Sequence, residues 1–433
     1  MNEQLRSNGM RAGSLLGKAW RRLAEHPLAR IGPGLITGVA DDDPSGIATY
    51  SQAGAQFGLN MLWTMPLAFP LMAAVQSMCA RIGRVTGKGL AANIKLAFPP
   101  VVLRAVVLLL LVANTLNIAA MGEVSEMVTG WNRYVMTILL ALTTLVMQIF
   151  IPYHRYVFYL KWLTLSLLAY AAVLFTVHVP WGQVALRMVW PQFKLDANAA
   201  TVVVGVFGTT ISPYLFFWQA SEEVEEMRAH HDGALVTDRN GAAKPELRRI
   251  KWDTWSGMFY SDLTAIFIML ATAVTLHVAG ITNIDTAAQA AGALRPLAGD
   301  GAYLLFALGI LGVGLIGVPV LAGSAGYAMA EAMGWKWGLE RKATDARGFY
   351  GVIAFSILVG ILLEYSPISP MKALFWSAVI NGVVAVPLLV VIILLASRRS
   401  VMGEYTASRT LVVLGWVAAI VMGAAAVMMF LPG

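Results

Sequence analysis

The sequence predicts an all-α integral membrane protein that contains two inverted five-helix repeats, with helices 1 and 6 broken, plus an eleventh transmembrane helix. Three observations predict this class: a composition poor in charge, eleven long apolar segments, and two matched helix breaks. Of the 433 residues, 58% are hydrophobic and 13% are charged, about half the charged fraction of a soluble protein. The single cysteine, Cys79, excludes an intramolecular disulfide and a cysteine-based metal site.

Residues 1–30 are polar and basic and lack the apolar core of a signal peptide, so we expect a cytosolic tail. After it, apolar segments long enough to cross about 30 Å of hydrocarbon follow one another. They lack the strict alternation of a membrane β-barrel, which makes them helices. The eleven predicted spans are 31–52, 61–80, 105–130, 134–152, 157–179, 200–221, 254–278, 301–332, 348–364, 371–396 and 410–431.

The distribution of lysine and arginine gives the expected orientation. With a cytosolic N-terminus, 26 of the 31 basic residues fall on the cytosolic side, as in most multi-pass proteins. This predicts a multi-pass protein of the cell (inner) membrane with its C-terminus outside. The net charge of +7 then needs no nucleic-acid partner. The lipid bilayer is the expected surrounding, and the oligomeric state is left open, a monomer included.

Two of the spans contain helix breakers near their middle. The first contains Asp43-Pro44-Ser45-Gly46, and the sixth contains the run 208–214, GTTISPY. Proline removes a backbone donor and glycine eases the chain out of helical geometry. Prolines that merely kink the helices are the alternative. A matched pair five spans apart is typical of transporters built from inverted repeats, here about 31–180 and 198–396. The transporter core is thus 31–396, and residues 397–433 add the eleventh helix.

The chemistry of the two breaks favours a bound cation. Asp43 places a carboxylate at membrane depth, where no lysine or arginine lies beside it in the sequence, so the substrate is the expected counter-ion. The other candidate ligands are carbonyls near Ala40 and Thr209 and the Ser212 hydroxyl. A site made only of oxygen suits Mg²⁺ and Ca²⁺ and tolerates Mn²⁺.

Other acids have less certain places in this scheme. Asp41 and Asp42 either line an access path or cap the first half-helix. In the third span, Glu123 is expected to line the pathway, with Glu126 on the same helix face.

The remaining polar candidates lie near the cytosolic side or in later spans. The glutamates at 222, 223, 225 and 226 form either an acidic exit funnel or a solvated helix end, and Asp262 is expected to face them. Asn381-Gly382 is a weaker polar candidate in the tenth span. The pair His230-His231 is expected to be solvated, with metal binding as the alternative.

These residues resemble the Nramp family of divalent-metal transporters over nearly the whole chain. The stretches that carry the resemblance are GPGLITGVADDDPSGIATYSQAGAQFG at 32–58, RIGRVTGKGLA at 81–91 and GTTISPY at 208–214. The family's first-span motif is Asp-Pro-Gly-Asn, whose Asp and Asn bind metal. The resemblance therefore implies a metal site at Asp43, Gly46, Thr209 and Ser212, a LeuT-type fold and alternating access.

At three places the sequence departs from the family pattern, and all three departures favour the same branch of the family. Gly46 stands at the position of the motif's Asn. In the sixth span, Ser212 replaces the metal-binding Met and Tyr214 replaces a His. In the third span, the family's Asp-Leu-Ala-Glu reads 120–123, AMGE, so only Glu123 is kept. These changes resemble the Nramp-related magnesium transporter branch and imply Mg²⁺ and Mn²⁺ as transported ions, no cofactor, and no obligatory proton coupling.

Three other functions remain as alternatives. A proton-coupled Mn²⁺ or Fe²⁺ transporter is the nearest of them. A transporter of small organic solutes such as amino acids is disfavoured, because Asp43 would repel their carboxylates. A metal sensor or membrane enzyme is disfavoured too, because the sequence offers no central set of nucleophile, base and orienting group. We therefore expect no enzymatic activity.

Overall fold

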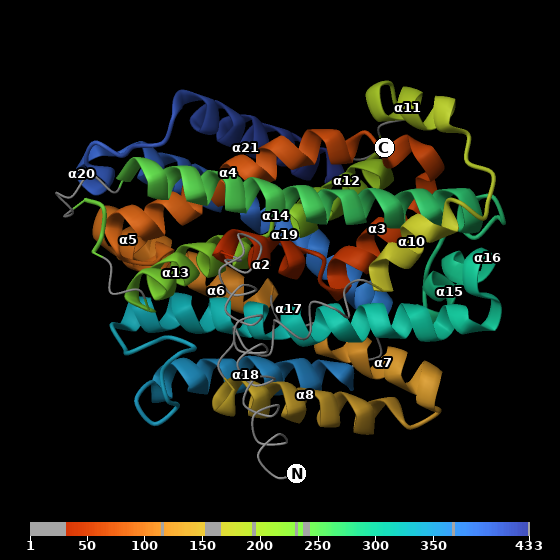
Figure 1. Cartoon of the computed structure of the whole chain (residues 1–433), viewed down its shortest axis with the longest axis horizontal. Coiled ribbons are helices and arrows are strands. Elements are labelled where there is room, and N and C mark those ends of the chain that lie inside the picture. Colours follow the sequence, from red (N-terminus) through yellow and green to blue (C-terminus); the bar gives the residue numbers. More distant parts are fainter. Residues whose placement is uncertain are drawn as a thin grey trace, which may run out of the picture.

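The computed structural model describes residues 32–113, 117–151, 166–192, 196–229, 233–236, 243–365 and 369–431. Within these ranges the secondary structure is entirely helices and turns. The long helices run nearly parallel to one another (Figure 1). The predicted basic tail 1–30 and the pair His230-His231 lie outside the described residues.

The first half of the chain begins with a helix in two pieces. Because Pro44 cannot donate a backbone hydrogen bond, α2 ends at Asp41 and α3 begins at Pro44. The elements are α2 (Pro33–Asp41), α3 (Pro44–Phe57), η2 (Gly58–Met61), α4 (Thr64–Thr86), α5 (Leu90–Ala97), α6 (Pro100–Ala113), α7 (Asn117–Thr129), α8 (Arg133–Phe150), α10 (Leu168–Val173) and α11 (Trp181–Val189).

The second half repeats the broken start. Here α12 ends at Thr210 and α13 begins at Pro213. The elements are α12 (Ala197–Thr210), α13 (Pro213–Ala229), α14 (Ala243–Thr272), η4 (Ala273–His277), α15 (Ala287–Ala291), η5 (Gly292–Leu294), α16 (Arg295–Ala298), η6 (Gly299–Gly301), α17 (Ala302–Met333), α18 (Arg347–Glu364), α19 (Pro370–Ser397), α20 (Arg399–Met402) and α21 (Arg409–Met429).

Seven helical segments among the described residues are long and apolar enough to cross a membrane. They correspond to the predicted spans 2, 4, 6, 7, 8, 10 and 11. The first span appears as α2 and α3, the third as α6 and α7, and the ninth as the shorter apolar stretch Arg347–Leu362. Much of the fifth span lies outside the described residues, so the count of eleven stays a prediction.

Both breaks are shorter than the sequence suggested. Pro44, Ser45 and Gly46 already belong to the first turn of α3. This agrees with the preference of proline for the first turn of a helix, where its missing N–H needs no partner. Likewise, the run 208–210 is still helical in α12. The non-helical residues are therefore only Asp42 and Asp43 in the first break, and Ile211 and Ser212 in the second.

Glycines let the broken helices pack closely on their neighbours. A Cβ on Gly38 would collide with the backbone of Gly257 in α14. In the same way, a Cβ on Gly208 of α12 would collide with Gly382 of α19. Such backbone contacts are typical of helix pairs in membranes. The polar candidate Asn381-Gly382 thus serves in part to seat α12.

The bundle has two ends that matter for the site. One end, the α5 end, carries α5 and α20; the other, the α11 end, carries α11, α15 and α16 (Figure 1). Along one side, α17, α18 and α8 lie against one another. Under the predicted orientation, the α5 end is cytosolic.

Candidate functional site

Asp43 lies at the first break and its carboxylate accepts three hydrogen bonds. It is the N-cap of α3, and its side chain is buried. Its Oδ1 accepts hydrogen bonds from the Ser45 hydroxyl at 2.6 Å and the Gly46 amide at 2.8 Å. Its Oδ2 accepts one from the Tyr214 hydroxyl of α13 at 3.1 Å. The carboxylate therefore joins the two broken helices at the positive end of α3.

Each break leaves one carbonyl without its helical donor. In an α-helix a carbonyl accepts from the amide four residues later. For Ala40 that residue is Pro44, and for Thr209 it is Pro213, so neither carbonyl has a backbone donor at that position. These are the two carbonyls proposed from the sequence. The spacing of the prolines is the physical reason why they are free for another partner.

Ser212 supplies a substitute donor at the second break. Its hydroxyl lies 2.6 Å from the Thr209 carbonyl and 2.9 Å from the Gly208 carbonyl. The Thr209 hydroxyl in turn lies 3.4 Å from the Ser45 hydroxyl of α3. Thr209 and Asp43 are therefore linked through Ser45, which brings the two breaks to one place.

Gly46 packs closely against oxygen atoms of both breaks. A Cβ added there would lie 3.3 Å from the Asp41 carbonyl oxygen and 3.4 Å from the Thr209 hydroxyl oxygen, with the Tyr50 ring also at 3.3 Å. A longer side chain at this position would have to displace these neighbours. The four residues named for the site, Asp43, Gly46, Thr209 and Ser212, thus come together as predicted, although metal binding by them stays a prediction.

Sequence reasoning missed two partners of Asp43. Tyr214 was considered only as the loss of a histidine, yet its hydroxyl bonds to the carboxylate. Ser45 was considered only as a helix breaker, yet it bonds both to Asp43 and toward Thr209. A serine two residues after an N-cap aspartate is a signal that could have found the second of these.

The expectation for Asp262 is wrong. Asp262 lies on α14, close enough to Asp41 for their charges to interact. The charged neighbours of Glu223 are instead Arg249, Asp253 and Glu226. The reason is geometric: α14 is 30 residues long and starts at Ala243. Position 262 therefore lies deep in the bundle, more than three turns beyond Arg249.

Glu123 and Glu126 make contacts near the α11 end. The Glu123 carboxylate accepts from the Ala287 amide at 2.9 Å and so caps α15. Glu126 accepts from the Arg133 amide at 3.3 Å, at the start of α8. No hydrogen bond described in the structure joins Glu123 to either break, so its role on the pathway stays a prediction. The same holds for the carbonyl of Ala40.

The glutamates 222–226 do not form a solvated helix end. Glu223 is buried and pairs with Arg249 at 2.7 Å. Glu225 accepts from the Tyr327 hydroxyl at 2.6 Å and from the Leu339 amide at 2.9 Å. Both groups fasten α13 to neighbouring elements. An open acidic funnel at this place would require these contacts to break.

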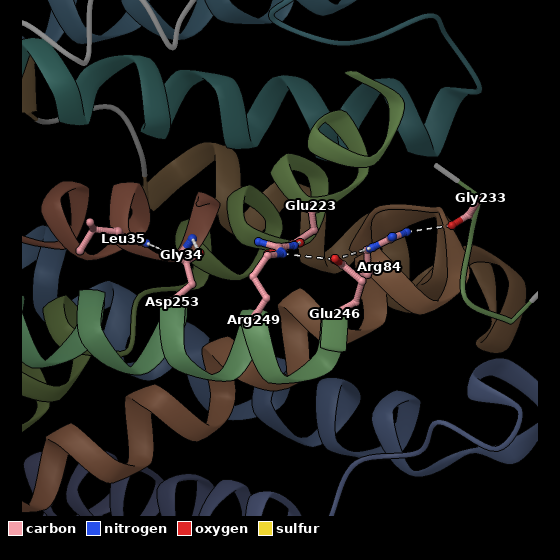
Figure 2. A network of polar contacts seen from close by, with 8 residues as sticks. All are labelled: Gly34, Leu35, Arg84, Glu223, Gly233, Glu246, Arg249 and Asp253. Carbon is pink, nitrogen blue, oxygen red and sulfur yellow. Dashed lines mark hydrogen bonds and ion pairs between the residues drawn. The ribbon is translucent and has the colours of Figure 1, made fainter. Parts of the chain in front are cut away.

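Figure 2 shows how α14 ties several elements together at the α5 end. Asp253 accepts from the Gly34 amide at 2.7 Å and the Leu35 amide at 3.3 Å, and so caps the start of α2. Arg249 binds Glu223 of α13 and, at 3.2 Å, Glu246. Arg84 pairs with Glu246 at 3.3 Å and donates to the Gly233 carbonyl at 2.8 Å. We call these contacts around Asp253, Arg249 and Glu246 of α14 the α14 lock.

A cavity opens toward the α11 end of α3. A cavity of about 320 Å³ is lined by Ala48 and Gln52 of α3 and by Phe375 and Trp376 of α19, among others. None of the residues that line it belongs to either break. The side chains at the two breaks themselves are closed off from solvent, since Asp43, Thr209 and Ser212 are each 0% exposed.

Comparisons with known proteins settle the family. The family model described as "Natural resistance-associated macrophage protein-like" matches residues 34–432. The chain belongs to the Nramp family. As a member it is a multi-pass membrane protein.

Relatives in sequence are called divalent metal cation transporters MntH. The one from Acidiphilium cryptum is 27% identical, over 90% of this chain and 87% of its own length. The one from Deinococcus radiodurans is 26% identical, over 95% of this chain and 92% of its own length. The similarity is therefore spread over the whole Nramp chain and is not confined to the two breaks.

Solved structures confirm the predicted architecture. A manganese transporter from Eremococcus coleocola superimposes with a TM-score of 0.72 at 16% identity, covering 94% of this chain and 86% of its own. Mhp1, a nucleobase-cation-symport-1 family transporter, superimposes with a TM-score of 0.54 at 12% identity, covering 92% of each chain. The all-α fold of this Nramp protein is thus of the LeuT type.

Proposed function

We propose that this Nramp protein transports hard divalent cations, with Mg²⁺ as the main substrate and Mn²⁺ as a second one. The transported ion binds at Asp43, Gly46, Thr209 and Ser212, and the protein works by alternating access in the inner membrane with its N-terminus in the cytosol. The observation that carries the proposal is the donor set at the joined breaks. Every ligand candidate there is oxygen, and the Thr209 carbonyl, which Pro213 leaves without its backbone donor, belongs to it.

The oxygen-only donor set supports a hard ion over a soft one. Ser212 stands where the family places a thioether, and a hydroxyl has no preference for later transition metals. Mg²⁺ keeps several of its waters when it binds to proteins. The Thr209 carbonyl can accept hydrogen bonds from those waters, and the hydroxyls of Ser45 and Ser212 can donate to them or accept from them.

Alternating access is supported by the contacts that close the site. Asp43, Thr209 and Ser212 are each 0% exposed, so an ion can reach or leave them only after a change of conformation. At the α5 end, the α14 lock holds both α2 and α13, and release of an ion there requires the lock to open.

Proton coupling is not needed for accumulation. A divalent ion that enters a compartment at −100 mV gains about 4.6 kcal/mol. This corresponds to about three orders of magnitude in concentration. The competing function is a proton-coupled Mn²⁺ or Fe²⁺ transporter, and the similarity to a protein called a manganese transporter favours Mn²⁺ as the ion.

The deciding experiment uses proteoliposomes that contain one dye for Mg²⁺ and another for internal pH. A potassium gradient with valinomycin sets the interior negative. We expect Mg²⁺ entry that grows with the potential, with no acidification of the interior, and no entry with Asp43→Asn. Mn²⁺ entry accompanied by acidification, without Mg²⁺ entry, would establish the competing function.

A further inference from the structure

Another cavity, which we call the α4 cavity, lies at the α5 end of the bundle, away from both breaks. Its volume is about 600 Å³, within the range of sites that hold small molecules. α4 packs against both α14 and α21, and all three helices line the cavity. Arg81 enters it from the last turns of α4, Lys251 from the first turns of α14, and Ser408 from the start of α21.

The charge of the α4 cavity is positive. Arg81 and Lys251 line it, and no acid is among its lining residues in the described part of the chain. Arg81 Nε donates to the Tyr405 carbonyl at 2.7 Å, which holds the guanidinium in place without neutralising it. Among the described residues, neither Arg81 nor Lys251 forms an ion pair, whereas Arg84 and Arg249 of the α14 lock both pair with glutamates. Two full positive charges are thus left for a partner from outside the chain.

The start of α21 adds partial positive charge to the same cavity. Ser408 is the N-cap of this helix, and its hydroxyl accepts from the Leu411 amide at 3.4 Å. The other amides of the first turn have no carbonyl of their own helix to bond to. They and the helix dipole favour an anion. This effect is smaller than that of Arg81 and Lys251, but it has the same sign.

An apolar stripe leads from the cavity toward the middle of α14. Trp255 and Phe259 follow Lys251 at intervals of four residues, so all three lie on one face of the helix. Phe69 of α4 packs edge-on against both aromatic rings, with centroids 5.6 Å from Trp255 and 5.7 Å from Phe259. Phe259 is 55% exposed. At about 1.5 Å per residue the stripe extends about 12 Å from Lys251, a feature that a small soluble anion would not use.

We propose that the α4 cavity binds an anionic phospholipid from the leaflet at the α5 end. The headgroup phosphate lies at Arg81 and Lys251, and one acyl chain follows Trp255, Phe69 and Phe259. Basic pockets between membrane helices are typical of sites for anionic lipids, and tryptophan is typical of the level of the headgroups. A zwitterionic lipid is disfavoured, because the two bases repel its ammonium group. The inference does not depend on which ion the protein transports.

The test titrates the delipidated full-length protein in a nonionic detergent and counts bound lipids by native mass spectrometry. The probes are dioleoylphosphatidylglycerol, dioleoylphosphatidylcholine and inorganic phosphate. One basic side chain near a membrane surface changes the affinity for an anionic lipid about fivefold. The wild type should therefore bind phosphatidylglycerol about 25-fold more tightly than phosphatidylcholine. Lys251→Gln and Arg81→Gln should each reduce this preference about fivefold.

Three further variants separate charge from structure. Lys336→Gln removes the same charge at an exposed position after α17, also at the α5 end, and should leave the preference unchanged. Arg81→Lys keeps the charge, so it should retain most of the preference even if the contact with Tyr405 is lost. Phe259→Ser shortens the apolar stripe and should weaken both lipids alike, by about threefold.

The outcomes decide for or against the lipid. Equal affinities of the wild type for the two lipids would overturn the proposal, as would an equal loss of preference in Lys336→Gln and Lys251→Gln. Displacement of phosphatidylglycerol by an equal concentration of inorganic phosphate would show that the cavity holds a soluble anion, and would overturn it as well. None of these measurements involves ion transport, so the proposed function stands or fails separately.

Discussion

The two helix breaks meet at one place but differ in charge. The first break carries three carboxylates in a row, and Asp43 takes the favourable position at the start of α3. The second has no ionisable acid or base between Thr210 and Pro213, and its serine hydroxyl bonds back to the carbonyls of its own helix. One break therefore supplies the charge and the other supplies neutral dipoles.

The charged break should attract divalent cations in general, and the neutral break should determine which of them is preferred. A carboxylate attracts any divalent cation, since Coulomb attraction depends on charge and distance. The neutral ligands decide how well a particular ion is matched, because their softness and geometry differ from metal to metal. Changes at Asp43 should thus affect all ions alike, while changes at Ser212 should shift one ion against another.

The largest expected effect is at the charged break. Asp43→Asn and Asp43→Ala should both reduce Mg²⁺ uptake by about a hundredfold or more, because a charge-assisted contact to the ion is lost. Asparagine can still cap α3, whereas alanine cannot, so only Asp43→Ala should also lower the unfolding free energy, by about 1 kcal/mol. Uptake in proteoliposomes and thermal unfolding in detergent measure the two effects. Wild-type Mg²⁺ uptake by either variant would remove Asp43 from the site.

At the neutral break, Ser212→Met should change the preference for one ion over another more than the total rate of ion uptake. A thioether in place of the hydroxyl should raise the affinity for Cd²⁺ and Mn²⁺ relative to Mg²⁺ by about tenfold. Ser212→Leu is the matched control, since it has a similar size without the sulfur. Competition between Mg²⁺ and Cd²⁺ uptake gives the ratio. An equal shift in both variants would mean that volume, and not sulfur, determines the preference.

Restoring a backbone donor should partly repair the second break. Pro213→Ala gives residue 213 an N–H that can bond to the Thr209 carbonyl, which then becomes less available to the ion. We expect the affinity for Mg²⁺ to fall about fivefold, the equivalent of one hydrogen bond of about 1 kcal/mol. Pro296→Ala, in the short helix α16 at the α11 end, is the control. Unchanged affinity in Pro213→Ala would show that the Thr209 carbonyl does not meet the ion.

The smallest expected effect concerns the half-helices at the α5 end. Asp253→Ala removes the cap of α2 but leaves the pairing of Arg249 with Glu223 of α13 in place. The amides of Gly34 and Leu35 should exchange with solvent about threefold faster, as expected for the loss of a helix cap. Hydrogen exchange with mass spectrometry measures this, and Asp345→Ala, at an exposed acid, is the control. Equal acceleration in α13 would mean that both half-helices are released together.

Much of the fold could be predicted from the sequence because its signals are local or repeat along the chain. Apolar length identifies the spans, and two prolines mark the breaks. The same signals placed Asp43, Thr209 and Ser212 together, since the inverted repeat brings the two breaks to the same depth.

The rest depends on contacts between residues far apart in the chain. Asp253 caps α2 across 219 positions, and Ser261 reaches Asp41 across 220. Whether a carboxylate in α14 faces Glu223 or Asp41 depends on where α14 begins, which the sequence pattern placed 11 residues too late, at 254 instead of Ala243. That shift is the reason why Asp262 was assigned to the wrong neighbours.

The contact between Gly38 and Gly257 has a mechanical consequence. Because backbone meets backbone there, no side chain can yield between α2 and α14. Gly34 makes a second contact of this kind, with the backbone of Thr254, one turn nearer the α5 end. Two such contacts four residues apart prevent α2 from tilting on α14, so we expect the two helices to move as one rigid unit in any change of conformation.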